Sequence, residues 1–307
     1  MDYKSGYNSG NIDLHIHSTA SDGSRDPLDI VSLVKKAGIK AFALTDHDSI
    51  DGAKKILAHP QMLGPVKFLT GVEISAASPD FFSASGSFHI LGYGIRVDHP
   101  DLNQTLQQQR SARKNRNPQI IARLNELGFD ISLDEVISSS EKDAQIGRPH
   151  IARVMVQKGF VPSINEAFDT YIGKGNPAYI DKPRVDCAKA IALILSAGGV
   201  PILAHPGLLD VVDFNAYEYF LSELVPMGLM GIEAYYPSHS VEETDYFIEL
   251  AEIFGLLTTG GSDFHGAINP EVWIGTGTGN LSVPYILYER LVYTITHLQS
   301  NGPNSRN

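Results

Sequence analysis

The chain has 307 residues, 43% of them hydrophobic, and a formal net charge of −11. These values indicate a globular protein and exclude a general nucleic-acid coat. Its single cysteine, Cys187, excludes an intrachain disulfide, so any metal site must use His, Asp and Glu. No apolar run approaches the roughly 18–20 residues that cross a bilayer, and residues 1–10 carry no signal-peptide core. We therefore expect a cytoplasmic protein of one or two domains that does not enter membranes.

The first hundred residues alternate short apolar strands with helices. We expect helices at 27–37 and 51–57, and strands at 12–17, 39–44, 66–69 and 88–93. Strands that alternate with helices at short spacing are typical of βαβ units and a parallel sheet. In barrels of this kind the chemistry lies where the strands end, and polar residues follow each predicted strand here.

A polar, helix-rich stretch comes next. Its expected helices are 101–127, interrupted before Pro118, and then 134–138, 150–158 and 163–171. Residues 106–185 hold 12 Lys/Arg and 9 Asp/Glu, whereas the remainder holds 12 basic and 26 acidic residues. We expect 104–184 to be a helical insertion that forms a substrate-binding cap, with 1–103 and 185–307 forming the barrel.

The barrel pattern then resumes. We expect helices at 187–197, 217–227 and 242–254, and strands at 199–204, 231–235 and 256–259. The first and last of these strands end at Ala204-His205-Pro206 and at Gly261-Ser262-Asp263-Phe264-His265, which are again polar.

Potential metal ligands gather at these strand ends. His15 and His17 are two apart on one strand, so their side chains point to the same side, and Asp22 follows in a loop. A pair of structural histidines would be the alternative explanation for this one motif. Six of the 11 histidines belong to the full set, which argues against chance: His15, His17, Asp22, His47, Glu73, His89, His205, Asp263 and His265.

Nine nitrogen and oxygen ligands are too many for one tetrahedral zinc ion. They suit two or three divalent ions, with the two oxygens of Glu73 as the bridge. Clustered metals about 3.5–4 Å apart lower the pKa of a bridging water and bind phosphoryl oxygens. Mn is our first choice, and Fe or Zn also suits mixed imidazole and carboxylate ligands.

The series of motifs resembles the PHP (polymerase and histidinol phosphatase) family of metal-dependent phosphoesterases. The motifs, in chain order, are His15-x-His17, Ser21-Asp22-Gly23, Thr45-Asp46-His47-Asp48, Gly71-Val72-Glu73-Ile74, His89-Ile90-Leu91-Gly92, Ala204-His205-Pro206 and Gly261-Ser262-Asp263-Phe264-His265. The resemblance implies an α/β fold, a distorted (β/α)7 barrel, with three metals. They would be held by His15, His17, Glu73 and Asp263; by Asp22, His47 and His265; and by Glu73, His89 and His205.

The resemblance also implies roles for neighbouring groups. A metal-bound hydroxide held by Glu73, Asp263 and His265 would attack phosphorus in line. Asp46 and Asp48 flank a ligand and would orient the His47 imidazole without binding metal.

The insertion narrows the resemblance to a subgroup that hydrolyses nucleoside 3′,5′-bisphosphates, some of whose relatives trim RNA from the 5′ end. Arg113 and Arg116 share a helix face, although a solvated face is the alternative for such a run. Arg148 and His150 open a predicted helix, where an anion is favoured. Two further candidates for substrate binding are Lys174 and His239.

These features predict a phosphoesterase that removes the 3′-phosphate of a nucleoside 3′,5′-bisphosphate to leave a 5′-monophosphate. The alternatives are a 5′–3′ exonuclease on short RNA or DNA, a histidinol-phosphate phosphatase, and a metal-binding regulatory module without activity. The arginines of the insertion argue against histidinol phosphate, and the full set of ligands argues against the regulatory module. We expect small phosphorylated nucleotides as partners, with short oligonucleotides as the second choice, and no obligate protein partner.

Overall fold

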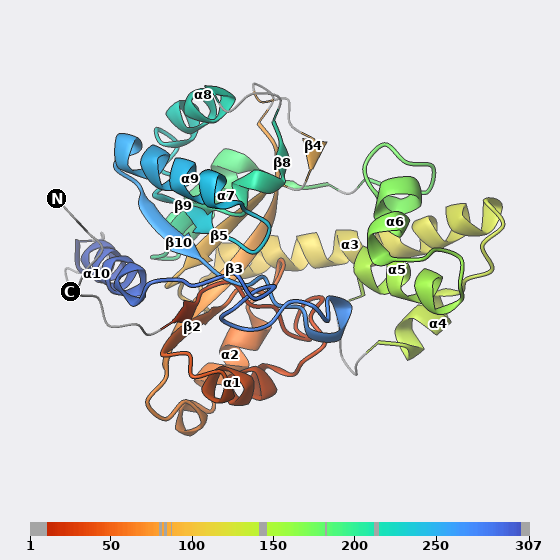
Figure 1. Cartoon of the computed structure of the whole chain (residues 1–307), viewed down its shortest axis with the longest axis horizontal. Coiled ribbons are helices and arrows are strands. Elements are labelled where there is room, and N and C mark those ends of the chain that lie inside the picture. The colour runs from red at the N-terminus through yellow and green to blue at the C-terminus, as the bar shows by residue number, and fades with distance from the viewer. Residues whose placement is uncertain are drawn as a thin grey trace.

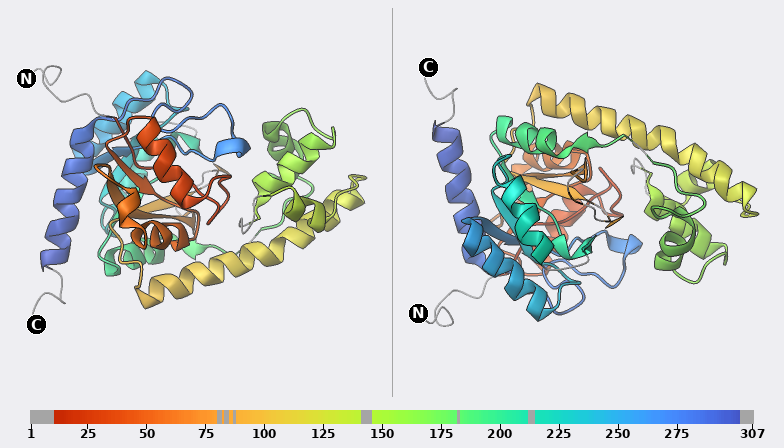
Figure 2. Two further views of the ribbon diagram at one scale, coloured as in Figure 1. Left: turned by 90° about the horizontal axis from the view of Figure 1, so that it is seen from below. Right: turned by 90° about the horizontal axis from the view of Figure 1, so that it is seen from above.

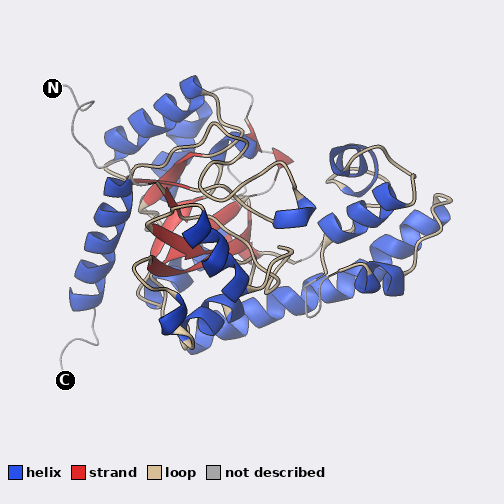
Figure 3. Ribbon diagram, turned by 60° about the horizontal axis from the view of Figure 1, so that its bottom comes forward, coloured by secondary structure: helices blue, strands red, loops and turns tan. Residues whose placement is uncertain are grey.

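The computed structural model of the chain describes residues 11–79, 82, 85–86, 88–140, 146–181, 183–211 and 215–301. One half of the molecule is a sheet surrounded by helices, and the other half is entirely helical (Figures 1 and 3). The long helix α3 (Pro100–Glu126) runs from the first half to the second. None of the helices in the described ranges is both long and apolar enough to span a membrane.

A mixed sheet forms the barrel. Its strands follow one another in space as β1 (Ile12–Asp13), β2 (Ala41–Leu44), β3 (Lys67–Ala77), β5 (His89–Tyr93), β7 (Val200–Leu203), β9 (Gly231–Tyr235) and β10 (Leu257–Gly260). The strand β6 (Val185–Asp186) pairs with β3 outside this path. Two further strands, β4 (Ser85–Gly86) and β8 (Leu209–Asp210), form a small antiparallel sheet.

The barrel is parallel except at β5. This strand pairs antiparallel with both β3 and β7, so the expectation of a fully parallel sheet is wrong there. The physical reason lies in the short connection 78–88, because a parallel crossover needs a dozen or more residues and usually a helix. The reversal places His89, at the start of β5, at the same rim as the ends of the parallel strands.

Backbone hydrogen bonds close the sheet. The segment after β1 pairs with the segment after β10, with Leu14 N donating to Gly260 O at 3.1 Å and Asp263 N donating to His15 O at 2.8 Å. His17 N also donates to Phe264 O at 2.9 Å. The expected α/β fold, a distorted barrel built on a path of seven strands, is therefore confirmed.

Helices cover the outside of the barrel. The helix α1 begins as the sequence predicts, because the Asp26 side chain accepts from Leu28 N and Pro27 occupies the first turn. The helices of the barrel are α1 (Pro27–Lys36), α2 (Asp51–Leu57), α7 (Cys187–Ser196), α8 (Asn215–Leu224), α9 (Val241–Phe254) and α10 (Tyr285–Asn301), with short turns at η1 (Pro60–Met62), η3 (Pro206–Leu208) and η4 (Gly266–Ile268).

The helical half has its own apolar core. Its elements are α4 (Leu133–Ser138), α5 (Arg148–Gln157), α6 (Ile164–Ala167) and the π-helical turn η2 (Phe168–Ile172). With α3 they enclose a buried cluster that is separate from the barrel clusters and lies within 120–178. The predicted helix 163–171 is present as one continuous helical segment, 164–172, which changes from α-helix to a π-helical turn at Phe168. We call residues 104–184 the insert, and its bounds as a domain stay a prediction.

The helix α3 belongs to both halves. Its first turns place Leu102 and Leu106 in a barrel cluster, and its last turns place Ile120 and Leu124 in the cluster of the insert. The helix continues through Pro118, so the expected interruption is wrong. Proline removes one helical N–H and crowds the preceding turn, but packing on both sides of Pro118 holds the backbone helical.

Candidate metal centre

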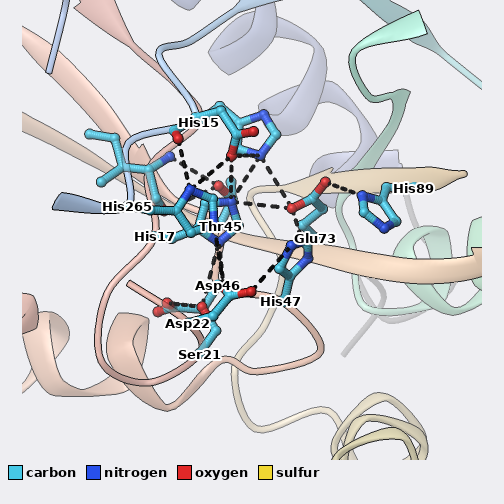
Figure 4. Close-up of polar contacts among 12 residues, drawn as sticks. His15, His17, Ser21, Asp22, Thr45, Asp46, His47, Glu73, His89 and His265 are labelled. Atoms are coloured by element: carbon cyan, nitrogen blue, oxygen red, sulfur yellow. Dashed lines mark hydrogen bonds and ion pairs between the residues drawn. The ribbon is translucent and has the colours of Figure 1, made fainter. Parts of the chain in front are cut away.

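The nine candidate ligands lie together at one rim of the barrel, and Figure 4 labels seven of them, all except His205 and Asp263. His15 and His17 follow β1, His47 follows β2, and Glu73 stands inside β3. Asp22 lies in the loop after His17, and the remaining four come from the far half of the sheet: His89, His205, Asp263 and His265. Eight of these side chains form three groups, and within each group the ligand atoms lie within 4.8 Å of one another.

The first group combines two histidines with two carboxylates. His17 Nε2 lies 3.0 Å from Asp263 Oδ1 and 3.2 Å from Glu73 Oε2. His15 Nε2 lies 3.3 Å from the same Glu73 oxygen and 3.1 Å from His17 Nε2. The members are the four that the family resemblance assigns to one ion, namely His15, His17, Glu73 and Asp263.

The second group surrounds Asp22. His265 Nε2 lies 3.4 Å from Asp22 Oδ1, and His47 Nε2 lies 3.9 Å from Asp22 Oδ2. The ring of His17 stacks on that of His265 with centroids 4.2 Å apart, which brings His17 into this group as well.

The third group surrounds Glu73, which lies between His47 and His89 (Figure 4). Its Oε2 is 2.9 Å from His47 Nδ1, and its Oε1 is 2.7 Å from His89 Nδ1. His205 Nε2 also approaches Oε1 at 2.9 Å, but the compact group contains His47 in its place. Glu73 is the one carboxylate that belongs to two groups.

The chemistry of these groups fits divalent cations. Buried nitrogen and oxygen atoms converge without enough protons to pair them, and Asp22 Oδ1 and His205 Nδ1 have no hydrogen-bond partner among the described residues. Burial opposes ionisation of Glu73, yet the adjacent His47 and His89 hold the pKa of its carboxyl well below the usual range. A charged carboxylate among imidazoles is the donor set that Mn, Fe or Zn binds.

Glu233, on β9, positions two of the histidines. Its Oε1 accepts a hydrogen bond of 2.9 Å from His15 Nδ1, which leaves His15 Nε2 free to face the first group. Its Oε2 accepts from His205 N at 2.8 Å. Sequence reasoning missed this role, although an acidic residue inside the apolar strand Gly231–Tyr235 was a usable signal.

Asp46 and Asp48 are placed differently from the expectation. Asp46 accepts from Ser18 N and Ser21 Oγ, both at 2.7 Å, and so fixes the loop that carries Asp22. Asp48 accepts from Ser75 N and forms an ion pair of 2.9 Å with Arg113. The ring nitrogens of His47 face Glu73 and Asp22 instead.

A small pocket of about 150 Å³ adjoins the ligands. We call it the arginine pocket, because Asp22, His47 and His89 form one side and four arginines form the other: Arg113, Arg116, Arg148 and Arg184. Arg113 and Arg116 come from α3 and are 6% and 5% exposed. Sequence reasoning missed Arg184, which stands next to β6 and far from any motif.

Two cations of the arginine pocket, Arg116 and Arg148, have no carboxylate of the described residues within 4.0 Å, whereas Arg113 pairs with Asp48 and Arg184 with Asp181. Burial and the nearby cations of Arg148 and Arg113 lower the pKa of Arg116 to about 9. The Nε atoms of Arg113 and Arg116 are buried and have no hydrogen-bond partner among the described residues. Crowded guanidinium groups with unused donors suit a phosphate, whose oxygens accept from the planar arginine fork.

The other predicted substrate residues have different surroundings. His150 is buried beside the pocket, its Nδ1 accepts from Gly147 N at 3.2 Å, and burial lowers its pKa to about 4. Lys174 is exposed in a turn and does not line the arginine pocket. His239 donates from Nδ1 to Ala234 O at 2.8 Å and accepts at Nε2 from Gly207 N at 3.1 Å. Both its ring nitrogens are therefore occupied, which argues against a contact with substrate.

A larger hollow of about 750 Å³ opens on the other side of the ligands, and we call it the open cleft. Asp263, His265 and Tyr236 line its barrel side, and Tyr236 donates a hydrogen bond of 2.8 Å to Asp263. Pro149 and Phe168 of the insert line both this cleft and the arginine pocket. The candidate metal centre thus lies between two hollows that the insert and the barrel form together.

Comparison with known proteins extends these observations. The model of the PHP domain family matches residues 13–190. The chain is 32% identical over 255 residues to a 3′,5′-nucleoside bisphosphate phosphatase of Chromobacterium violaceum, an alignment that covers 83% of this chain and 87% of the relative. It is 32% identical to a 5′-3′ exoribonuclease of Haemophilus influenzae, covering 86% of this chain and 92% of the relative.

A third relative has another substrate in its name. It is the phosphoribosyl 1,2-cyclic phosphate 1,2-diphosphodiesterase of Eggerthella lenta, 29% identical, covering 86% of this chain and 97% of the relative.

Two solved structures share the fold. A Chromobacterium violaceum protein named as an amidohydrolase, with bound sulfate and no metal, superposes with a TM-score of 0.82 at 30% identity, covering 93% of this chain and 97% of that one. A Bifidobacterium adolescentis protein, whose name calls it a metal-dependent phosphoesterase, gives a TM-score of 0.80 at 26% identity over 94% and 98% of the two chains.

Proposed function

The chain belongs to the PHP domain family and is a metal-dependent hydrolase of phosphoester bonds, and we propose that its substrate is a nucleotide with two phosphates. The reaction that fits best is removal of the 3′-phosphate from a nucleoside 3′,5′-bisphosphate, which leaves a 5′-monophosphate. The relative from Chromobacterium violaceum carries this activity in its name.

The arginine pocket carries this proposal. It lies directly against Asp22, His47 and His89, so a phosphate inside it is adjacent to the groups proposed to hold metal. A substrate with one phosphate would leave either the pocket or the metal centre without its anion. A substrate with two phosphates occupies both at once, and binding of the remote phosphate positions the reacting one.

Different residues of this chain are proposed to bind metal, to orient other side chains and to bind the remote phosphate. We propose that the three groups around Asp22, Glu73 and Asp263 hold up to three divalent ions, with Mn as first choice. Divalent ions at such a centre polarise phosphoryl oxygens and lower the pKa of water. Glu233 keeps His15 oriented, and Asp48 holds Arg113 toward the pocket. The insert acts as a cap that supplies cations and limits access of water.

A 5′–3′ exonuclease on short oligonucleotides is the second candidate. The open cleft favours it, because a strand that continues beyond the scissile bond needs space next to the metal centre. The relative from Haemophilus influenzae has this activity in its name. Both candidates use the arginine pocket for a terminal phosphate, and they differ in what occupies the open cleft.

Replacing Arg116 by methionine tests the proposal. The change removes one guanidinium from the pocket while keeping the shape of the side chain, and a charge-assisted contact is worth about 1.5–3 kcal/mol. We expect Arg116→Met to lose about one to two decades in kcat/KM on a nucleoside 3′,5′-bisphosphate and to change little on p-nitrophenyl phosphate, which has no second anion. The melting temperature should hold or rise, because repulsion among the arginines decreases.

Lys114→Met is the matched control, since Lys114 is exposed on the same helix two residues away. Phosphate release should be measured on bisphosphates, monophosphates, cyclic phosphates, oligonucleotides and histidinol phosphate with Mn-loaded protein. An equal loss on both substrates would place Arg116 at the reacting phosphate. No loss on either would overturn the assignment of the pocket.

A further inference from the structure

A groove of about 630 Å³ lies behind the loop that carries Asp263 and His265. Along this loop the side chains alternate, since Asp263 and His265 line the open cleft while Phe264 and Gly266 line the groove. Figure 1 shows the same segment, after β10, passing above α1 with its short helix η4 directed toward the insert. The groove and the open cleft are therefore separated by one turn of chain.

The two hollows meet at their rim. Pro270 and Val272 line both of them, so the open cleft and the groove share part of their rim. The view from below in Figure 2 shows this segment on the side of the barrel that faces the insert. The groove thus adjoins the open cleft, which itself borders the candidate metal centre.

The groove combines apolar walls with an exposed indole. Leu33, Phe264 and Ile274 are among its apolar residues. Trp273, the single tryptophan of the sequence, also lines it and is 65% exposed. The backbone of Trp273 is held in a tight turn, with hydrogen bonds of 2.8 and 2.9 Å exchanged with Gly277. An exposed ring on a fixed backbone offers a flat surface, and only the side-chain torsions remain to be ordered when a ligand binds.

Two cations complete the groove. Arg25 and Lys36 line it, both are exposed, and no carboxylate of the described residues lies within 4.0 Å of either charge. Lys36 stands in the last turn of α1, where a positive charge interacts favourably with the helix dipole. Arg25 precedes α1 and so does not stabilise the helix in this way. Both cations line the same groove as the exposed indole of Trp273, so positive charge lies next to an aromatic surface.

We propose that this groove binds the nucleotides that follow the scissile bond of a single-stranded oligonucleotide. A base stacks on Trp273, and Arg25 and Lys36 contact the phosphates on either side. Aromatic surfaces next to cations are the usual means of holding single strands, and a purely apolar ligand would leave both cations unmatched. This inference rests on the proposed phosphoesterase function and names oligonucleotides as a substrate class of that same centre.

Kinetics as a function of chain length test the inference. For 5′-phosphorylated oligouridylates from a dinucleotide to an octanucleotide, we expect kcat/KM of the Mn-loaded protein to rise until the groove is filled. Trp273→Ala should lower kcat/KM on the long oligonucleotides about five- to hundred-fold. Arg25→Gln should lower it by a smaller factor, and this factor should decrease in high salt. Tyr293→Ala, an equally exposed aromatic change on α10, and Lys189→Gln on α7 are the matched controls.

The single tryptophan gives a second readout. A hydrolysis-resistant phosphorothioate octanucleotide should protect Trp273 from acrylamide quenching in the metal-loaded protein, and a nucleoside bisphosphate should not.

If Trp273→Ala follows the wild-type length dependence, or loses as much on the bisphosphate as on the octanucleotide, the inference is overturned. Hydrolysis of bisphosphates without any of oligonucleotides would also overturn it and leave the proposed function intact. Loss of both activities with the protection retained would instead count against the proposed function.

Discussion

Three non-glycine residues of the described part of the chain have a positive φ, and all three lie at the candidate metal centre. The angles are 51° at Asp48, 25° at His205 and 54° at Asp263. A residue other than glycine in this region costs about 1–3 kcal/mol and persists only where its surroundings hold it. At Asp48 and Asp263 the carboxylate is bound on more than one side, which is the compensation the strain requires.

Asp48 gives the first prediction at this scale. Asp48→Asn keeps a side chain that tolerates positive φ and an oxygen for Ser75 N, but it removes the charge that orients Arg113. We expect KM for a nucleoside bisphosphate to rise about ten-fold or more, with a smaller effect on kcat and none on p-nitrophenyl phosphate. Steady-state kinetics with both substrates measure the split, and an equal fall of kcat on both would contradict a role confined to Arg113.

At the scale of single elements, the sequence predicted most helices and strands but not their relations in space. The helix at Asp51–Leu57 and the strand at Gly231–Tyr235 have the predicted bounds, because the charges in the first and last turns of the helix and the apolar run of the strand are local signals. The direction of β5 depends on what precedes it, and the continuity of α3 through Pro118 depends on two cores. The helix α10 was not predicted at all, although Leu287 and Leu291 bury its inner face.

Most of the candidate ligands were found from sequence because they stand at or just after the end of a predicted strand, whereas Asp22 lies in a loop and His89 begins its strand. Their partners could not be found in this way. Glu233 and Arg184 acquire their roles only when distant segments meet, since each contacts or adjoins residues more than 25 positions away. His239, which the sequence predicts as a substrate contact from its place near a strand end, uses both ring nitrogens for backbone groups, and no sequence signal indicated these bonds.

Two matched capping boxes give the prediction at this scale. Ser132 and Glu135 cap α4 in the insert, and Ser240 and Glu243 cap α9 on the barrel. Replacing a capping serine by alanine costs about 1 kcal/mol. If the insert unfolds separately from the barrel, Ser132→Ala should lower only one transition in differential scanning calorimetry, and Ser240→Ala only the other. A single transition that both variants lower alike would contradict the proposed division into two domains.

The pH dependence of stability tests the capping box of Ser132 and Glu135. Hydrogen bonds from Lys158 and from Ser132 lower the pKa of Glu135 to about 2. A carboxyl whose pKa is lowered by folding stabilises the protein above its unfolded pKa, near 4.5. The stabilisation is then lost as the pH falls toward 2. The difference in melting temperature between wild type and Glu135→Gln should therefore be present at neutral pH and shrink on acidification through that window.

For the whole molecule, the distribution of charge differs between the barrel and the insert. The acidic barrel provides the carboxylates and imidazoles, and the insert with α3 provides the cations of the arginine pocket. The two meet along α3, whose opposite ends are buried in different cores. A shift of the insert relative to the barrel would therefore change the distance between the arginines and the candidate metal centre, so we expect the rigidity of α3 to set the spacing of the two proposed phosphate sites.

The metals connect this centre to the stability of the barrel. The proposed ligands come from six strands or the segments after them, so bound ions join parts of the sheet that are distant in sequence. A ligand present at 100 times its Kd stabilises the state that binds it by about 2.7 kcal/mol. We expect chelation to lower the barrel transition in calorimetry, Mn to restore it, and the transition lowered by Ser132→Ala to stay in place.

Metal content gives the matching measurement. Glu73→Gln removes the carboxylate shared by two of the three groups, whereas Asp22→Asn changes one group only. Elemental analysis after reloading with Mn should find up to three ions in the wild type, one fewer in Asp22→Asn and two fewer in Glu73→Gln. Both variants should also lose turnover, since each removes a proposed ligand from the centre. Saturation of the wild type by a single ion, or equal metal content in the two variants, would contradict a three-ion centre bridged by Glu73.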